Sequence, residues 1–533
     1  PEDEDGSTFE MKSRTIIFLL GLTATGFAAD ATKRPNILFN MTDQQRWDCV
    51  GANGNKLIRT PNMDRLAERG ANFRHAFVSS PVCVPSRISF FTGRYAHRHR
   101  NRVNHTPLDL DEVLMQARFK QAGYKTASVG KLHYYPPTQE EARRTGFDIV
   151  ELHDGVTATD LWSDYVRWWR ANDPASASLK NYRALAQDIA PGKNPFRAAI
   201  ETQFTDTAWT GDRARHHLQE LAAGDEPFFL HVSFWKPHSP YEIGPPYDSM
   251  YDHVEIPLPE RFGDEAVEEL PAPLQKLARR GAKGAGAQLD RERMQWIYRS
   301  YYGAVSHVDD EIGKLLDTLE QSGAAERTII VFTSDHGDQL MEHGINGKNC
   351  FFESSIRVPF MISLPGVIDE AKHDELVEAV DLMPTLLELC GLPEPRENQG
   401  RSLVPLITPG GGGYVPREAV FCENIIREVI NSGSLDLPFQ KGAGVDGIRH
   451  PDAKMVRTAR WKYCHYVGSG AELYDLIADP LEQNNLAADP GHKSVVQEMK
   501  GRLLDWLITS GETDQIADRW LLHTEQQKQR AKP

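Results

Sequence analysis

Short apolar runs of strand length alternate with amphipathic segments along most of this chain. Asn36–Met41, Phe228–Ser233 and Thr328–Ser334 are predicted to be buried strands, because each is a short run rich in apolar residues. Tyr301–Leu319 repeats apolar residues on one face at helical spacing, so it is predicted to be a helix. Strands that alternate with helices are typical of an α/β domain with a mostly parallel sheet.

Proline and glycine mark two further helices and a boundary. A helix is predicted from Pro61 to Glu68, because proline suits the first helical turn, and another is predicted over Asp381–Cys390. The four-glycine run Gly410–Gly413 follows a proline and is predicted to be a boundary or a surface loop.

The residues after this glycine run predict a smaller C-terminal part. Its expected elements are three short strands and a terminal helix, over Ala419–Cys422, Lys454–Thr458, Lys462–Tyr466 and Ser494–Leu507. A chain of 533 residues is also too long for a single core. We therefore expect a large α/β domain over residues 30–409 and a smaller α+β subdomain with an antiparallel sheet over residues 414–533.

The composition is that of an ordinary soluble protein, with 40% hydrophobic and 25% charged residues. The formal net charge is -15, since 60 lysines and arginines face 75 aspartates and glutamates, and there is no long basic run. This balance argues against a nucleic-acid partner held through phosphate contacts. Local basic clusters remain able to bind a small anionic substrate.

The first 29 residues predict a targeting segment. Met11 is followed by Lys12 and Arg14, then by an apolar run over residues 15–27 and two alanines, the pattern of a secretory signal peptide over residues 11–29. The apolar run is shorter than the roughly 20 residues that span a bilayer, and no later segment is apolar enough. We expect a secreted or periplasmic protein with no membrane span in the mature chain, and we interpret residues 1–10 as lying before the true start.

The most specific motif is Cys83-Val84-Pro85-Ser86-Arg87, followed by a Thr-Gly-Arg element at residues 92–94. Because Pro85 suits the first turn of a helix, Cys83 is expected at a helix N-terminus. Free N–H groups and the helix dipole favour a bound anion there. Taken alone, the motif is equally that of a buried structural cysteine before a helix.

Two acidic motifs follow predicted strands. Asp43 and Gln44 come just after one strand, and Asp335 and His336 directly after another, at the edge where open α/β sheets place their ligands. Two carboxylates with an amide oxygen suit a hard cation such as Ca²⁺ or Mg²⁺, whereas an imidazole ligand would also suit Mn²⁺ or Zn²⁺. Each acid taken singly is equally a cap of a helix or turn.

Basic residues and histidines complete the candidate site. Lys131 and His133 stand in a Gly-Lys-Leu-His element after an apolar strand, and Lys348 precedes a Phe-Phe-Glu element. His238 lies between two prolines, where it is either a turn residue or an acid that protonates a departing alcohol. Several cations around one site would repel one another unless they shared an anion.

Four elements resemble those of the formylglycine-dependent sulfatases in their order and spacing: TDQ at residues 42–44, CVPSR at 83–87, GKLH at 130–133 and SDHGD at 334–338. The resemblance runs from about Asn36 to about Leu486 and implies an alkaline-phosphatase-like large domain with a small C-terminal domain. It implies that a maturation enzyme oxidises Cys83 to formylglycine, the nucleophile. It also implies the remaining roles: Arg87 holds the nucleophile, Lys131, His133 and Lys348 contact nucleophile or sulfate, His238 is the acid, and the metal ligands are Asp43, Gln44, Cys83, Asp335 and His336.

Two positions depart from the common form of the family. Gln44 stands where many sulfatases have aspartate, and His336 where asparagine is frequent; choline sulfatases and phosphonate monoester hydrolases resemble this sequence better at Gln44. Calcium is the preferred metal on this resemblance. We expect a sulfate-ester hydrolase acting on a sulfated carbohydrate or an aryl sulfate, with hydrolysis of phosphonate monoesters or phosphodiesters as the alternative. A non-enzymatic binding protein with a degenerate site is a third hypothesis.

The remaining candidates have plainer interpretations. His97, His99, His105 and His343 are expected at the surface or at the fringe of the substrate site, where Asn104 is a further possible contact. The aromatic run over residues 162–169 either stacks on a sugar or forms helix core, the latter being favoured. Six cysteines are too few for a disulfide framework, and Cys422 with Cys464 is the one pair that we considered.

Overall fold

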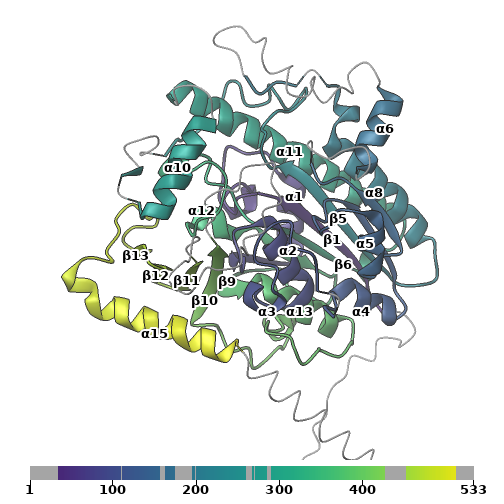
Figure 1. Cartoon of the computed structure of the whole chain (residues 1–533). Coiled ribbons are helices and arrows are strands. Elements are labelled where there is room, and N and C mark those ends of the chain that lie inside the picture. The colour runs from purple at the N-terminus through teal and green to yellow at the C-terminus, as the bar shows by residue number, and fades with distance from the viewer. Residues whose placement is uncertain are drawn as a thin grey trace, which may run out of the picture. The chain divides into compact units, whose positions relative to one another are not determined.

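The alternation of strands and helices builds a nine-stranded, mostly parallel sheet (Figure 1). The computed structural model describes residues 34–109, 111–155, 163–173, 195–198, 200–259, 267–268, 270–284, 290–425 and 452–511. Residues 1–29, with the predicted signal peptide, lie outside this part. Among the described residues no helix combines the length and the apolar character needed to cross a membrane.

The strand order is β4-β3-β5-β1-β6-β8-β2-β7, and β9 pairs with β2. The bounds are β1 Asn36–Asp43, β2 Ala71–Phe77, β3 Lys125–Gly130, β4 Ile149–Leu152, β5 Phe228–Pro237, β6 Thr328–Ser334, β7 Arg357–Val358, β8 Phe360–Ser363 and β9 Ala371–Glu378. The pairs that join β4, β3, β5, β1 and β6 are parallel, whereas β6 with β8 and β2 with β7 and β8 are antiparallel.

Helices cover both faces of this sheet (Figure 1). One face packs on α1, α8 and α11, and the other on α2, α4 and α13. Burial from both sides explains why β1, β5 and β6 are buried along their whole length and rich in apolar residues. The helix bounds are α1 Pro61–Glu68, α2 Cys83–Thr92, α3 Ala96–His99, α4 Met115–Gln121, α5 Gln139–Arg144, α6 Asp164–Asn172, α8 Asp206–Ala222, α10 Ala272–Gly284, α11 Arg291–Gln321, α12 Glu353–Ile356, α13 Leu382–Leu389, α14 Val404–Ile407 and α15 Lys493–Thr509.

A second, antiparallel sheet follows in the order β10-β11-β12-β13. Its strands are β10 Ala419–Ile425, β11 Asp452–Thr458, β12 Trp461–Tyr466 and β13 Gly470–Asp475. One face packs on α15 through residues such as Val456 and Trp506, and the other face joins the main core through residues such as Met455 and Tyr466. Pro35–Pro533 accordingly groups as one compact unit. The domain bounds 30–409 and 414–533 stay a prediction.

Most predicted elements are confirmed, with longer ends. The strand expected over Phe228–Ser233 continues to Pro237, and the helix expected from Tyr301 begins at Arg291. The strand β13 was not predicted, because its alternation of apolar and polar residues is short. The aromatic run forms helix core where it is described, since Tyr165 and Trp169 of α6 are buried.

The Cys422–Cys464 pairing is wrong. Both residues are opposite Met455 of β11, one on each side, so a whole strand separates them. Two inter-strand spacings amount to roughly 9–10 Å, which exceeds the roughly 7 Å that a disulfide can bridge. The described part of the chain contains no disulfide, and all six cysteine side chains are buried.

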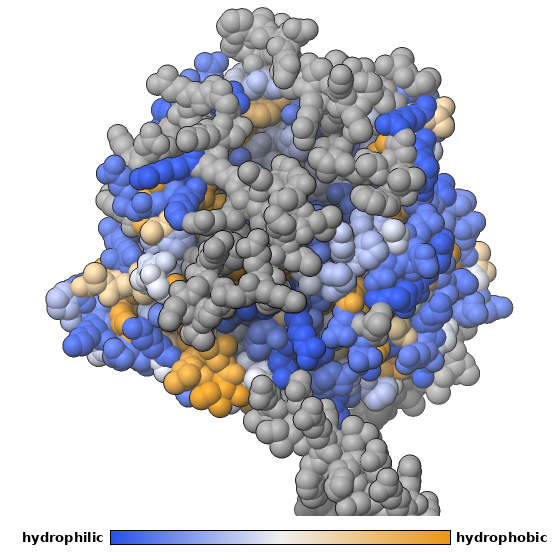
Figure 2. Space-filling view, in the orientation of Figure 1, coloured by the Kyte–Doolittle hydropathy of each residue, from blue (hydrophilic) through white to orange (hydrophobic). Residues whose placement is uncertain are grey.

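The face shown in Figure 2 is largely hydrophilic where it is coloured, apart from an apolar patch near the C-terminal end of α15. Leu504 and Ile508 of that helix are 58% and 59% exposed. Their exposure follows from the helix period, because the opposite face of α15 carries the residues that pack on the small sheet.

Candidate active site

The candidate site forms where β1 and β6 end side by side. Thr42 of β1 pairs with Ser334 of β6 in parallel register, and the Asp335 amide donates to Thr42 O at 3.1 Å. Asp43 and Asp335 therefore leave the same edge of the sheet, with both side chains buried. This is the edge at which open α/β sheets bind their ligands.

Cys83 is brought to this edge by α2. It is the first residue of the helix, as predicted, and its side chain is buried. The helix N-terminus is tied to its surroundings, because the Val84 amide donates to Asn104 Oδ1 at 3.0 Å and Ser86 Oγ donates to Asp335 O. Unsatisfied N–H groups at such an end favour a bound anion.

Four predicted metal ligands converge. The ligand atoms of Asp43, Cys83, Asp335 and His336 all lie within 4.8 Å of one another, and all four residues are buried. His336 Nδ1 lies 2.9 Å from Gly337 O, so it donates there and leaves Nε2 facing Cys83 Sγ at 3.2 Å. A fixed tautomer with a free Nε2 is how metal-binding histidines are usually held. The residues thus fit a divalent cation.

Gln44 joins this group through its side-chain oxygen. Its Nε2 donates to Asp338 Oδ2 at 2.6 Å, while its Oε1 accepts from Lys348 Nζ at 2.9 Å. The amide is thereby oriented with its oxygen toward the site, and its backbone N–H donates to Asp335 Oδ1 at 3.0 Å. Oxygen is the donor atom that hard cations prefer.

Two lysines face the reactive position. Lys348 Nζ is 2.9 Å from Cys83 Sγ, and Lys131 Nζ is 4.0 Å from it and forms a close ion pair with Asp43. Burial alone would raise the pKa of the Cys83 thiol, but Lys131, Lys348 and His336 outweigh it and hold that pKa well below its ordinary value. The position is electropositive and suits a sulfate or phosphonate group.

Arg87 contacts the two carboxylates of the site. Its guanidinium donates to Asp335 Oδ2 at 2.8 Å, to Lys131 O at 2.7 Å and to Ser233 Oγ at 2.8 Å, and it lies 3.6 Å from Asp43 Oδ2. Arg87 thus holds residues that surround Cys83, and the role at the nucleophile that the resemblance implies stays a prediction. Its side chain is buried, like both carboxylates.

The two predicted catalytic histidines also lie beside Cys83. His238 directly follows β5, its ring stacks on Trp235 with centroids 5.6 Å apart, and its Nδ1 contacts Ser239 O. Burial lowers the pKa of His238, and its contact with Cys83 opposes that shift. His133 is held by its backbone N–H, which donates to Asp154 Oδ1 at 3.0 Å, and its ring also interacts with Cys83.

The other histidines serve elsewhere. His97 bonds Glu423 at 2.8 Å, His99 contacts Ser89 Oγ at 3.0 Å, and His343 stacks on Phe352 with centroids 3.8 Å apart. His105 is the exception, because its ring lies 6.1 Å from that of His133, at the fringe of the site.

Sequence reasoning missed the residue that orients Gln44. Asp338 closes the Ser-Asp-His-Gly-Asp motif, yet its contacts with Gln44 and with Tyr241 OH, at 2.6 and 2.9 Å, appear only in three dimensions. The motif itself was the signal that could have found it.

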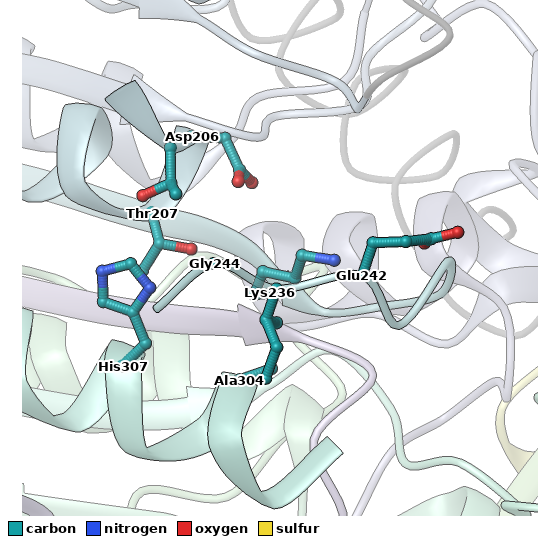
Figure 3. A pocket seen from close by; sticks show the side chains of 9 residues that line it. Asp206, Thr207, Lys236, Glu242, Gly244, Ala304 and His307 are labelled. Carbon is teal, nitrogen blue, oxygen red and sulfur yellow. The ribbon is translucent and has the colours of Figure 1, made fainter. Parts of the chain in front are cut away.

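A separate polar pocket is lined in part by Lys236 of β5 (Figure 3). Asp206, Glu242 and His307 also line it, together with several small residues. Lys236 Nζ donates to Pro240 O at 2.6 Å. The pocket shares no residue with the cluster around Cys83.

Comparison with known proteins agrees with this geometry. The Sulfatase family model matches residues 35–392. The multifunctional alkaline phosphatase superfamily protein PehA of Trinickia caryophylli is 29% identical over 92% of this chain and 97% of its own, and an arylsulfatase of Clostridium perfringens is 30% identical over 88% and 95%. The crystal structure of a phosphonate monoester hydrolase of Agrobacterium radiobacter is similar with a TM-score of 0.76 and 28% identity, over 90% of this chain and 96% of that one.

The chain therefore belongs to the sulfatase family, with the alkaline-phosphatase-like fold that the sequence predicted. Its enzyme class is that of the sulfuric ester hydrolases.

Proposed function

We propose that this protein hydrolyses sulfate monoesters with a formylglycine nucleophile made from Cys83 by a maturation enzyme. The observation that carries the proposal is the convergence on one buried cysteine of two lysines, two carboxylates and an imidazole. Such a set favours a tetrahedral anion that gains negative charge on its oxygens as the ester bond breaks.

The chain's own residues divide the work. Lys348 and Lys131 bind the sulfuryl oxygens and neutralise their charge, with His133 beside them. Arg87 holds Asp43 and Asp335 in place through the contacts given above. His238 is placed to give a proton to the leaving oxygen as its bond to sulfur breaks, so that the alcohol departs neutral. Water supplies the oxygen that balances the sulfate product.

Asp43, Gln44, Asp335, His336 and residue 83 would hold a divalent cation, for which we prefer Ca²⁺, with Mg²⁺ or Mn²⁺ as alternatives. When bound, this cation would act as a Lewis acid on the sulfuryl group, while hydrated formylglycine would supply an oxygen nucleophile and a second hydroxyl for sulfate release.

The natural substrate that we propose is a sulfated carbohydrate, met outside the cytoplasm after export by the predicted signal peptide. Two observations support it: the sulfatase family membership and the N-terminal charge and apolar pattern. A panel of sulfated sugars and polysaccharides tests the substrate, and fractionation of a tagged full chain tests the location. Turnover of aryl or choline sulfate alone would contradict the carbohydrate assignment.

Initial rates on 4-nitrophenyl sulfate and on a matched phenylphosphonate ester test the reaction itself. The protein is co-expressed with a formylglycine-generating enzyme, and Cys83→Ala is prepared in parallel. Faster hydrolysis of the sulfate ester, absent in Cys83→Ala, is the expected result. Full activity of Cys83→Ala would contradict the proposal.

A second function, hydrolysis of phosphonate monoesters or phosphodiesters at the same site, is favoured by two observations. Gln44 takes the place of the second aspartate, and the phosphonate monoester hydrolase noted above has a similar fold. A dominant phosphonatase rate in the same experiment would establish this second function. The non-enzymatic hypothesis requires instead that Cys83 remain unmodified while carbohydrate is bound.

A further inference from the structure

The segment that carries Lys348 leads into α12, which contacts the four-stranded sheet (Figure 1). Asn424 of β10 donates from its side-chain amide to Asn349 O at 3.0 Å. The Phe351 ring lies near that of Tyr466 of β12, with centroids 6.2 Å apart. These contacts join two parts of the chain that are far apart in sequence.

Lys462 of β12 makes charged contacts between the sheet and this segment, and its side chain is fully buried. Its Nζ lies 2.9 Å from Phe351 O, 2.8 Å from Glu353 Oε1 and 2.7 Å from Glu482 Oε1. The ammonium group therefore donates a hydrogen bond to the Phe351 carbonyl and forms buried ion pairs with both carboxylates. The segment from Phe351 to Glu353 is thereby fixed to β12.

Further charged groups surround this cluster. The Glu353 amide donates to Glu482 Oε2 at 2.7 Å, and the Glu353 carboxylate also lies 3.5 Å from Arg457 and 3.6 Å from Arg357. Removing one member of a buried ion pair leaves its partners uncompensated, at a high free-energy cost. The cluster therefore resists displacement of the segment that it holds.

Lys348 depends on this anchor because the backbone on each side of it is left-handed. Gly347 and Asn349, the residues on each side, have φ of 83° and 78°, in the left-handed region. Such a conformation persists when the surrounding structure holds it. Lys348 Nζ must also stay 2.9 Å from both Cys83 Sγ and Gln44 Oε1.

We propose that Lys462 is a positioning residue for the anion site: it anchors Phe351 and Glu353 and thereby sets the distance of Lys348 from residue 83. The inference rests on the role given to Lys348 in the proposed function. It assigns to the small sheet a part in substrate binding, although that sheet contributes none of the predicted catalytic or metal-binding residues.

A double-mutant cycle between Lys462 and Lys348 tests this. Lys462→Met, Lys348→Ala and the double variant are made as full chains and matured with the formylglycine-generating enzyme. KM for 4-nitrophenyl sulfate and the inhibition constant of inorganic sulfate are measured, with sulfate calorimetry where rates fall below detection. Lys462→Met should raise both KM and the inhibition constant at least about tenfold, because displacing a positioning group has effects on that scale.

The decisive comparison is the Lys348→Ala background, where Lys462→Met should add no further weakening, because residues that act through one another are not additive. Lys454→Met is the matched control, because Lys454 lies in the same sheet and pairs with Glu423, away from Phe351. It should keep wild-type sulfate inhibition. Equal losses from Lys462→Met in both backgrounds, or no loss in either, would overturn the proposal.

Failure of this inference is distinguishable from failure of the proposed function. If Cys83→Ala keeps full activity, the formylglycine reaction is wrong whatever the cycle shows. If activity requires Cys83 but the cycle is additive, only the role of Lys462 is wrong. Thermal unfolding of each variant shows that the compared proteins are folded.

Discussion

Asp338 fixes which atom of Gln44 faces the reaction site. The Gln44 Nε2 donates to Asp338 Oδ2 at 2.6 Å, and the amide oxygen therefore points to Lys348 Nζ, 2.9 Å away. A glutamine in place of an acid can serve as an oxygen ligand only if its amide oxygen, and not its nitrogen, points toward the metal. Asp338 thus makes the departure at Gln44 compatible with a metal site.

Replacing Asp338 by alanine should release the Gln44 amide and weaken metal binding. Loss of an outer-shell partner typically lowers metal affinity or activity 10–100-fold, and we expect an effect of about that size. The measurement is activity against the concentration of added Ca²⁺ or Mn²⁺. Tyr241→Phe removes the other side-chain partner of Asp338 and should have the smaller effect; an unchanged metal requirement in Asp338→Ala would count against this account.

Removal of metal should abolish turnover reversibly. We expect dialysis against a chelator to remove activity and lower the midpoint of thermal unfolding, because a cation that binds only the folded state stabilises it. Readdition of Ca²⁺, Mg²⁺ or Mn²⁺ in separate samples identifies the effective metal. His336→Asn should move the preference toward Ca²⁺, since an amide oxygen replaces a nitrogen donor; identical preferences in both proteins would exclude His336 as a ligand.

Arg87 should be essential to stability as well as activity. Arg87→Met leaves Asp335 without its 2.8 Å partner in a buried site, and breaking such a pair costs about 3–5 kcal/mol. Arg69→Ala is the matched control, because it breaks a surface pair with Glu320, worth roughly 0–1 kcal/mol. Urea unfolding measures both. Equal losses of unfolding free energy in the two variants would contradict a stabilising role for the Arg87–Asp335 ion pair.

Asp309 should make stability depend on pH. Burial raises the pKa of Asp309 to about 7, against the N–H donors of Met63 and Asn62 that lower it. The folded state then holds a proton that the unfolded state has lost, so this contribution to stability falls as pH rises from about 4 to about 7. Asp309→Asn cannot ionise, and its unfolding free energy should rise relative to wild type over that range. A constant difference would contradict the assignment.

The sequence was sufficient for the parts of the site that are local in the chain. Asp43 ends β1 and Asp335 directly follows β6, two strands with clear apolar runs, and neighbouring parallel strands end at the same edge. Cys83 at the start of α2 follows from Pro85 in the first turn. Family motifs supplied the order in which these pieces belong together.

Contacts between distant residues could not be predicted in this way. Nothing near Lys462 indicates that its ammonium binds Phe351 O, 111 residues away. The partners of Arg87 could not be predicted either, because a guanidinium one turn from Cys83 could reach either the nucleophile or the carboxylates. Its contacts with Asp43, Asp335 and Ser233 depend on the folded geometry of β1, β5 and β6.

The central claim is that residue 83, after oxidation, is the nucleophile of a sulfatase. The most direct measurement compares preparations matured to different extents, with the formylglycine fraction at position 83 determined by peptide mass spectrometry and the turnover of 4-nitrophenyl sulfate measured on the same samples. The account predicts turnover in proportion to that fraction, with none in Cys83→Ala. Turnover that is independent of the formylglycine fraction would contradict it.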